Sequence, residues 1–254
     1  MARDTSRESS RRGVRRGVYV LPALFTVGNI FCGYLSLDAT QHERYDLAAG
    51  LLFLAGFLDS LDGRVARMTG TTSAFGEQLD SLADVVSFGI APAFLVYHWA
   101  LDSYARLGLF VSFLFLVCGA CRLARFNVQV HVVDKRYFVG LPIPAAAGAL
   151  CGPIWALPEP VPLPWMKPAF LVLTLVLSYL MVSTLRYRSF KDVDLRSRRS
   201  ARLVPLVALV IAAVAAWRPD VCFAVIAIVY AASAPVGRVV ALLFPHKHAP
   251  TEAT

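Results

Sequence analysis

The residues best suited to chemistry are four aspartates that lie between two long apolar stretches. They are Asp59, Asp62, Asp80 and Asp84. Members of the first pair are three residues apart and members of the second pair are four apart, so on helices each pair shares one face. The segment 69–73 between the pairs has the composition of a turn. Carboxylates at membrane depth are costly and usually face a cavity. We therefore expect two neighbouring helices to direct four carboxylates into one pocket.

Four carboxylates in one pocket cannot all stay ionised without a positive counter-charge. Arg64 and Arg67 follow the first pair, and ordinary loop charges or ion pairs are the alternative interpretation. Two arginines cannot balance four aspartates, however, and a solvated loop would not need this spacing. Oxygen ligands without nearby histidine or cysteine favour magnesium, manganese or calcium over zinc. We therefore expect a divalent-cation site, where a pair of cations could also hold phosphate oxygens.

The aspartates are part of a longer pattern with fixed gaps. Its positions are Asp59, Asp62, Gly63, Ala66, Arg67, then eight residues, and Gly76, Asp80 and Asp84. This pattern resembles the signature of the CDP-alcohol phosphotransferase family at every position, over about a tenth of the chain. The resemblance implies that a hydroxyl displaces CMP from a CDP-activated lipid or alcohol in a membrane, with two divalent cations, Mg²⁺ or Mn²⁺ and possibly Ca²⁺.

The same resemblance assigns roles to individual positions. All four aspartates become metal ligands, and the fourth, Asp84, also becomes the catalytic base. The CDP group is expected to contact the rest of the signature, which comprises Asp59, Asp62, Gly63, Ala66, Arg67, Gly76 and Asp80. The two glycines leave room where a ligand approaches the backbone closely.

Later segments narrow the resemblance. They are 80–89, 122–127, 138–146 and 181–191. Each is similar to the corresponding segment of the membrane-embedded phosphatidylserine synthases of bacteria, and together they extend the resemblance over most of residues 20–195. This implies CDP-diacylglycerol as the donor, L-serine as the acceptor and a homodimer.

Arg122, Arg125 and Asn127 are candidates for holding the acceptor. The two arginines are three apart, on one face at the end of an apolar stretch. A guanidinium can bind the carboxylate of serine, or a lipid phosphate, through two parallel hydrogen bonds. The alternative for the arginines is ordinary anchoring at the membrane surface, and the alternative for Asn127 is a helix C-cap.

The composition indicates a polytopic membrane protein. The chain has 254 residues, of which 57% are hydrophobic and 17% charged, and its mean hydropathy is +0.59. We expect an all-α membrane bundle with a basic tail at 1–17, one catalytic domain at 18–244 and a short tail at 245–254. The net charge is +8. Because the basic residues flank apolar runs, anionic membrane lipids are the expected partner and nucleic acid is not.

Hydropathy predicts eight transmembrane helices. They cover about 19–38, 46–67, 75–99, 105–126, 140–157, 166–185, 203–217 and 221–243. With an interior N-terminus, 21 of the 25 lysines and arginines fall on the interior side, as the positive-inside rule requires. We therefore expect a multi-pass protein of the cell (inner) membrane whose aspartates lie on the cytosolic side.

Other functions remain open at this stage. The nearest is the same transfer to glycerol 3-phosphate or inositol phosphate, which would need a second anion site near the cations. A divalent-cation transporter would need polar residues continuing towards the exterior, whereas the second and third predicted spans are apolar beyond the aspartates. A lipid-binding protein without activity would leave the signature unexplained.

Overall fold

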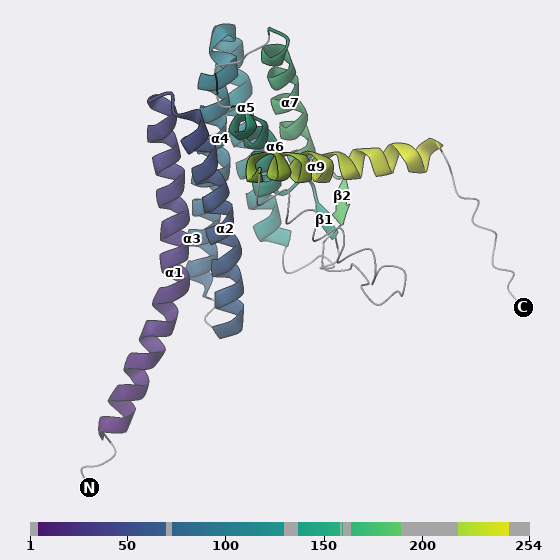
Figure 1. Ribbon diagram of the computed structural model, residues 1–254. Coiled ribbons are helices and arrows are strands. Elements are labelled where there is room, and N and C mark those ends of the chain that lie inside the picture. The colour runs from purple at the N-terminus through teal and green to yellow at the C-terminus, as the bar shows by residue number, and fades with distance from the viewer. Residues whose placement is uncertain are drawn as a thin grey trace, which may run out of the picture.

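The computed structural model describes residues 5–69, 73–129, 137–157, 159, 164–188 and 218–243. Most of this part is helical (Figure 1). The longer helices are α1 (Thr5–Gln41), α2 (Tyr45–Thr69), α3 (Ala74–Asp84), α5 (Ala105–Gln129), α6 (Ile143–Ala156), α7 (Met166–Val182) and α9 (Pro219–Leu243). The prediction of an all-helical bundle is confirmed for these elements.

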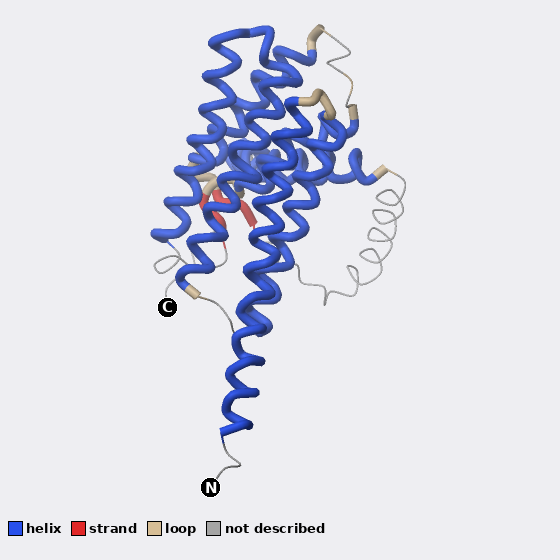
Figure 2. The backbone as a smooth tube through the Cα atoms, turned by 90° about the vertical axis from the view of Figure 1, so that its left-hand side faces the viewer, coloured by secondary structure: helices blue, strands red, loops and turns tan. Residues whose placement is uncertain are grey.

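Helices α1 and α2 form an antiparallel hairpin, visible in both views of the backbone (Figures 1 and 2). Small residues allow the two helices to approach closely: Ala48, Ala49 and Ala55 of α2 are completely buried. On the facing side, the Ser36 hydroxyl of α1 donates to the carbonyl oxygen of Ala48 at 2.9 Å. This hairpin fixes the face of α1 that meets the first pair of aspartates.

A second helical run begins at α3 and continues almost to α5. It passes through a π-helical segment η1 (Val85–Ile90), α4 (Ala91–Val96), a second π-helical segment η2 (Tyr97–Leu101) and a 3₁₀ turn η3 (Asp102–Tyr104). In η1 the Ala91 N–H donates to Val86 O, five residues back, and the next residue, Pro92, has no N–H to donate. Wider π turns often occur at functional sites, and η1 starts directly after Asp84.

The run reverses sharply into α5. Ala105 has a positive φ of 47° at the turn. One turn into α5, a Cβ on Gly108 would collide with the carbonyl oxygen of Leu101. Glycine is therefore required for the two helices to pack this closely after so short a connection.

Two short strands were not predicted. β1 (Tyr137–Val139) pairs antiparallel with β2 (Arg186–Arg188), and Phe138 lies opposite Tyr187. The strands bring the chain before α6 next to the chain after α7. Gly140 follows β1 with φ 81°, and its N–H donates to Leu185 O at 2.8 Å.

Helix α9 takes a direction that hydropathy did not indicate. It forms where the eighth span was predicted, but it runs across the other helices (Figures 1 and 2). Against α6 the contact is close, because a Cβ on Gly152 would lie 2.6 Å from the Cα of Ala224. At β2, the Tyr187 hydroxyl donates to Ala231 O at 3.1 Å.

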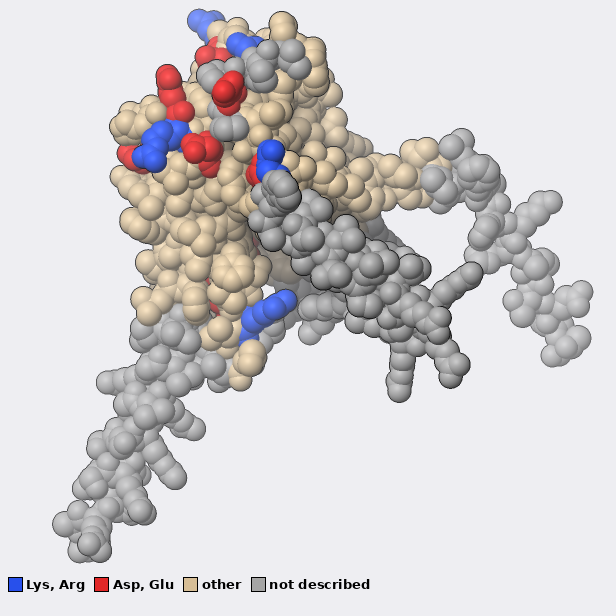
Figure 3. Space-filling view, in the orientation of Figure 1, with Lys and Arg blue, Asp and Glu red and all other residues tan. Residues whose placement is uncertain are grey.

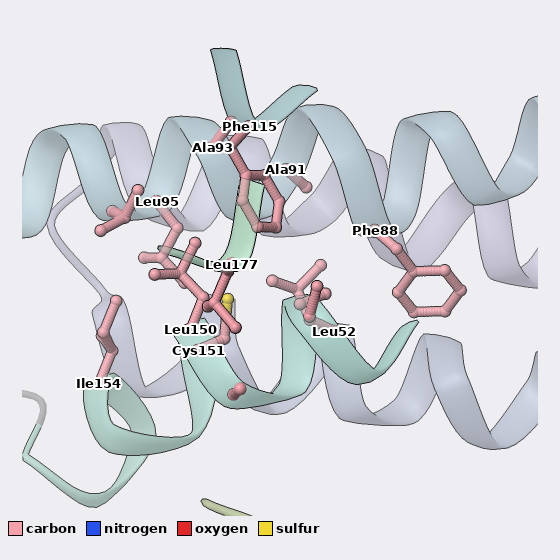
Figure 4. Packing of buried hydrophobic residues seen from close by; sticks show 14 of the residues in the cluster. Leu52, Phe88, Ala91, Ala93, Leu95, Phe115, Leu150, Cys151, Ile154 and Leu177 are labelled. Atoms are coloured by element: carbon pink, nitrogen blue, oxygen red, sulfur yellow. The ribbon is translucent and has the colours of Figure 1, made fainter. Parts of the chain in front are cut away.

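The buried core lies where helices from both halves of the bundle meet (Figure 4). Leu52 of α2, Phe88 of η1, Leu95 of α4, Leu150 of α6 and Leu177 of α7 all belong to it. These side chains lie where α2 and η1 pack against α6, which in turn packs against α7.

The apolar surface agrees with a membrane-associated helical protein. In the part of the chain that the structure describes, two stretches are long and apolar enough to cross a membrane: Ala74–Val128, which turns back on itself near Ala105, and Pro219–Val239. On the face shown in Figure 3, most of the described charged side chains gather at the upper end, above a broad uncharged surface. Six of the predicted spans overlap with α1, α2, the run from α3 to η2, α5, α6 and α7, although α6 and α7 are among the shorter apolar helices. The seventh, 203–217, lies outside the described residues.

Candidate active site

The structure brings together three of the four aspartates from two helices. Asp59 and Asp62 lie on α2, and Asp80 lies on α3. One oxygen from each of these carboxylates lies within 4.8 Å of the other two. Asp62 is only 5% exposed, and the other two are half-buried. Three of the four carboxylates that the spacing predicted to share a pocket therefore lie close together.

Asp84 lies at the end of α3, one turn beyond Asp80. Its carboxyl group interacts with the Asp59 carboxyl group. Two buried oxygens in the cluster, Oδ1 of Asp80 and Oδ1 of Asp84, have no hydrogen-bond partner among the described residues. Buried polar atoms without partners are rare in proteins and call for an explanation such as an ion or ligand.

These residues fit a divalent cation. The donor set is entirely carboxylate oxygen, which suits hard cations. Three carboxylates already converge, and partnerless oxygens lie buried beside them. The chemistry of the donors therefore agrees with a cation site formed by Asp59, Asp62 and Asp80.

The start of α3 is set by a local cap. Ser73 is the N-cap residue, and its hydroxyl oxygen accepts from the Gly76 N–H at 3.0 Å. A Cβ on Gly76 would lie 3.2 Å from that hydroxyl oxygen. Glu77 donates its N–H to Ser73 O. This cap fixes where α3 begins and thereby sets the rotation at which Asp80 faces α2.

The remaining signature residues lie at the end of α2. Gly63 follows Asp62 and is half-buried. Ala66 and Arg67 fall in the last turns of α2, and their side chains lie outside the described residues. Their role in holding the CDP group stays a prediction.

Helix α1 supplies a contact that the sequence analysis missed. The hydroxyl of Thr26 donates to Oδ2 of Asp62 at 3.1 Å, and Thr26 is 6% exposed. A hydrogen bond to one carboxylate oxygen orients the other oxygen, which is how neighbouring residues often position metal ligands. The signal in the sequence is a polar residue within the first apolar run.

Arg122 is a buried basic residue that interacts with the aspartates. It lies on α5, is only 7% exposed, and interacts electrostatically with Asp84. Its guanidinium carbon lies 5.2 Å from the centre of the Phe126 ring. Its Nε is buried without a partner among the described residues. Arg122 thus has an unused donor beside the aspartates.

Arg125 is oriented differently. Its guanidinium donates to four backbone carbonyl oxygens, those of Val182 at 2.9 Å, Met181 at 3.2 Å, Ser183 at 3.2 Å and Val139 at 3.3 Å. It therefore joins α5 to the C-terminal end of α7 and to β1. The two arginines that the sequence grouped together have separate surroundings in the structure.

Asn127 connects two helices. Its Nδ2 donates to the hydroxyl oxygen of Ser81 at 2.9 Å. The Ser81 hydroxyl in turn donates to Glu77 O at 3.0 Å. The end of α5 is therefore tied to the residue that follows Asp80 on α3.

An apolar pocket of about 280 Å³ lies against α2. It is lined by Leu52, Phe53, Gly56, Phe57, Ser60, Phe88, Pro144, Ala147, Gly148, Cys151 and Phe223. Ser60, which follows Asp59 in the sequence, lines this pocket, so the same turn of α2 carries a carboxylate and part of the apolar lining. A ligand with a phosphate at the aspartates and an apolar tail would find both environments here.

Comparison with known proteins identifies the family to which this chain belongs. The sequence profile of the family described as CDP-alcohol phosphatidyltransferase matches residues 19–180. The chain belongs to this family.

Individual relatives agree in their names. The chain is 41% identical to the CDP-diacylglycerol–serine O-phosphatidyltransferase of Helicobacter pylori (strain 26695) over 181 residues, which are 69% of this chain and 75% of that protein. It is 33% identical to the protein of the same name from Bacillus subtilis over 183 residues, 72% of this chain and 97% of that protein. It is 35% identical to the Mycobacterium leprae protein of that name over 217 residues, which are 83% of this chain and 71% of that protein.

Proposed function

We propose that the chain transfers the phosphatidyl group of CDP-diacylglycerol to the hydroxyl of L-serine and releases CMP. The observation that carries this proposal is the convergence of Asp59, Asp62 and Asp80 within 4.8 Å, in a member of the CDP-alcohol phosphatidyltransferase family. The choice of serine is supported by relatives from several organisms that bear the name of this activity.

Asp59, Asp62 and Asp80 hold the two divalent cations in this proposal, with Asp84 at their edge. Bound there, Mg²⁺ or Mn²⁺ would neutralise the diphosphate and the charge that develops on the departing CMP phosphate. Thr26 keeps Asp62 in place through its hydrogen bond. The chain's own contribution is thus a set of oxygens on two helices, α2 and α3, that both pack against α1.

Asp84 takes the proton from the serine hydroxyl as that oxygen attacks the phosphorus. A general base must first be within reach of the hydroxyl and must have a free oxygen. The buried Oδ1 of Asp84 has no partner among the described residues, and Arg122 stands nearby. Arg122 binds the carboxylate of serine in this proposal and orients the hydroxyl towards Asp84.

The CDP-lipid is held along the same helices. Gly63, Ala66, Arg67 and Gly76 bind the CDP group in this proposal, beside the aspartates of the signature. The apolar pocket that Ser60 helps to line receives part of an acyl chain. Asn127 supports the acceptor side through its link to Ser81.

The setting of the enzyme is proposed from the distribution of charge. In this proposal the aspartates lie on the cytosolic side of the cell (inner) membrane, because the predicted spans leave 21 of the 25 basic residues on that side. The basic segment 186–202 then lies near anionic headgroups. A homodimer is proposed from family membership alone.

An acceptor competition tests the proposed function. Purified protein in detergent receives CDP-diacylglycerol, Mg²⁺ or Mn²⁺, and one of L-serine, glycerol 3-phosphate or inositol phosphate, and CMP release is measured. We expect release with serine and formation of phosphatidylserine. Release with a phosphorylated alcohol and none with serine would reassign the acceptor, and no release with any alcohol would reject the transfer.

A further inference from the structure

Helix α1 carries a buried amide that the described part of the protein leaves unsatisfied. Asn29 is completely buried. Neither its Nδ2 nor its Oδ1 has a hydrogen-bond partner among the described residues. Burying an amide without hydrogen bonds costs free energy. An asparagine in this state therefore points to a ligand that satisfies it.

Two contacts locate Asn29 beside the aspartates. Thr26, three residues earlier and so on the same face of α1, donates to Asp62. The backbone carbonyl of Asn29 accepts from the Ser87 hydroxyl at 2.9 Å, and Ser87 lies three residues beyond Asp84. Asn29 therefore stands between the α2 carboxylates and the turn that follows Asp84.

The other polar residues on this face of α1 have partners. Ser36 lies seven residues after Asn29, two helical turns along the same face, and is also completely buried. Its hydroxyl donates to Ala48 O at 2.9 Å. Between them, a Cβ on Gly33 would lie 2.6 Å from the Ser87 hydroxyl oxygen, so α1 and η1 are in close contact there. Among Thr26, Asn29 and Ser36, only the side chain of Asn29, near the aspartates, has no partner among the described residues.

From this placement we infer that Asn29 contacts the substrate during the transfer. Its Nδ2 donates a hydrogen bond to an oxygen of the phosphoryl group that is transferred from CMP to the acceptor. This rests on the proposed function and adds a third helix to the site. A neutral amide can donate to a phosphate oxygen without competing with the cations for carboxylates. Its Oδ1 then accepts from a hydroxyl or ammonium of the second substrate. A hydrogen bond to a charged oxygen is among the stronger kinds.

The test uses Asn29→Leu, which keeps the number and branching of the side-chain heavy atoms and removes the amide. Turnover is measured as CMP release from CDP-diacylglycerol and L-serine. Thermal unfolding of the purified full chain in detergent is measured with and without CDP-diacylglycerol and Mg²⁺. Asn29→Ala provides the same test with a smaller side chain, and Ser36→Ala is the matched control on the same face of α1.

We expect kcat/KM for CDP-diacylglycerol to fall at least about tenfold in Asn29→Leu, the loss of one hydrogen bond to a charged oxygen. The unfolding midpoint without substrate stays equal to wild type or rises, because an unpaired buried amide has been removed. The increase in midpoint on adding CDP-diacylglycerol becomes smaller. Ser36→Ala shows the opposite pattern, a lower midpoint with turnover near that of wild type.

Three results would overturn the inference. They are unchanged turnover in both Asn29 variants, an unfolding midpoint lowered as in Ser36→Ala with a normal response to CDP-diacylglycerol, and reduced turnover with that response intact. Failure of the proposed function is distinguishable, since wild-type protein would then release no CMP with serine. The response of the unfolding midpoint to CDP-diacylglycerol still reports on Asn29 in that case.

Discussion

Arg122 and Arg125 offer a sharp test, because their surroundings predict opposite consequences of the same substitution. Arg122 is buried beside Asp84 and has an unused donor. The guanidinium of Arg125 donates to four backbone carbonyls, which lie at the end of α7, directly after it and in β1. We expect Arg122→Ala to affect serine binding and Arg125→Ala to affect stability.

The magnitudes follow from these contacts. A charge-assisted hydrogen bond contributes about 1.5–3 kcal/mol, so Arg122→Ala should raise the Michaelis constant for serine by about one to two decades. If the contact is equal in the ground and transition states, the turnover number stays constant. Three of the four bonds of Arg125 are 3.2 Å or longer, so their joint contribution is about 2–3 kcal/mol rather than four full bonds. For a chain of this size that lowers the unfolding midpoint by on the order of 5–10 °C.

The assay combines steady-state kinetics, with each substrate varied in turn, and thermal unfolding in detergent. Arg125→Lys is the control, because it keeps the charge while a single ammonium cannot reach four carbonyls, and it should restore only part of the stability. The reasoning is refuted if Arg125→Ala raises the serine constant as much as Arg122→Ala does while the midpoint stays at the wild-type value. It is equally refuted if Arg122→Ala leaves the serine constant unchanged.

Two further predictions follow from the backbone and the membrane orientation. Gly140→Ala should destabilise the protein by at least about 1–3 kcal/mol, the cost of a side chain at φ 81°, since its Cβ would also collide with Met181 O. Gly237→Ala is the control, because no atom lies within 4 Å of the added Cβ. It should leave stability unchanged or raise it by about 0.5–1 kcal/mol. Equal unfolding midpoints in the two variants would contradict the structural requirement for glycine at position 140. For orientation, single cysteines Ser73→Cys and Glu159→Cys in a cysteine-free background should react with an impermeant reagent from opposite sides of the membrane. Labelling of Ser73→Cys on intact cells would reverse the proposed topology.

The aspartate cluster was predictable because it depends on local geometry. Spacings of three and four on two helices place each pair on one face, and both helices pack against α1. Asp59, Asp62 and Asp80 meet accordingly. The Thr26 contact was not predicted, since nothing in the local pattern says which face of α1 meets α2.

The sequence did not separate Arg122 from Arg125, although the two differ in what they contact. Their spacing places both on one face of α5, but the carbonyls that bind Arg125 come from the end of α7, the residue directly after it and β1, more than fifty residues away for three of the four. Strands of three residues, such as β1 and β2, are too short to produce a recognisable alternation. Hydropathy predicted the residues of α9 but not its crosswise direction, because an apolar stretch specifies length and leaves orientation to packing.

The central claim is that Asp59, Asp62 and Asp80 together hold the cations on which transfer to serine depends. The most direct measurement is CMP release from CDP-diacylglycerol and L-serine as a function of Mg²⁺ or Mn²⁺ concentration, for wild type and for Asp59→Asn, Asp62→Asn and Asp80→Asn. We predict that wild-type turnover requires the cation and that each variant loses it at ordinary cation concentrations while remaining folded in detergent. Turnover at the wild-type level in any one variant, or in wild type after complete removal of divalent cations, would contradict the account.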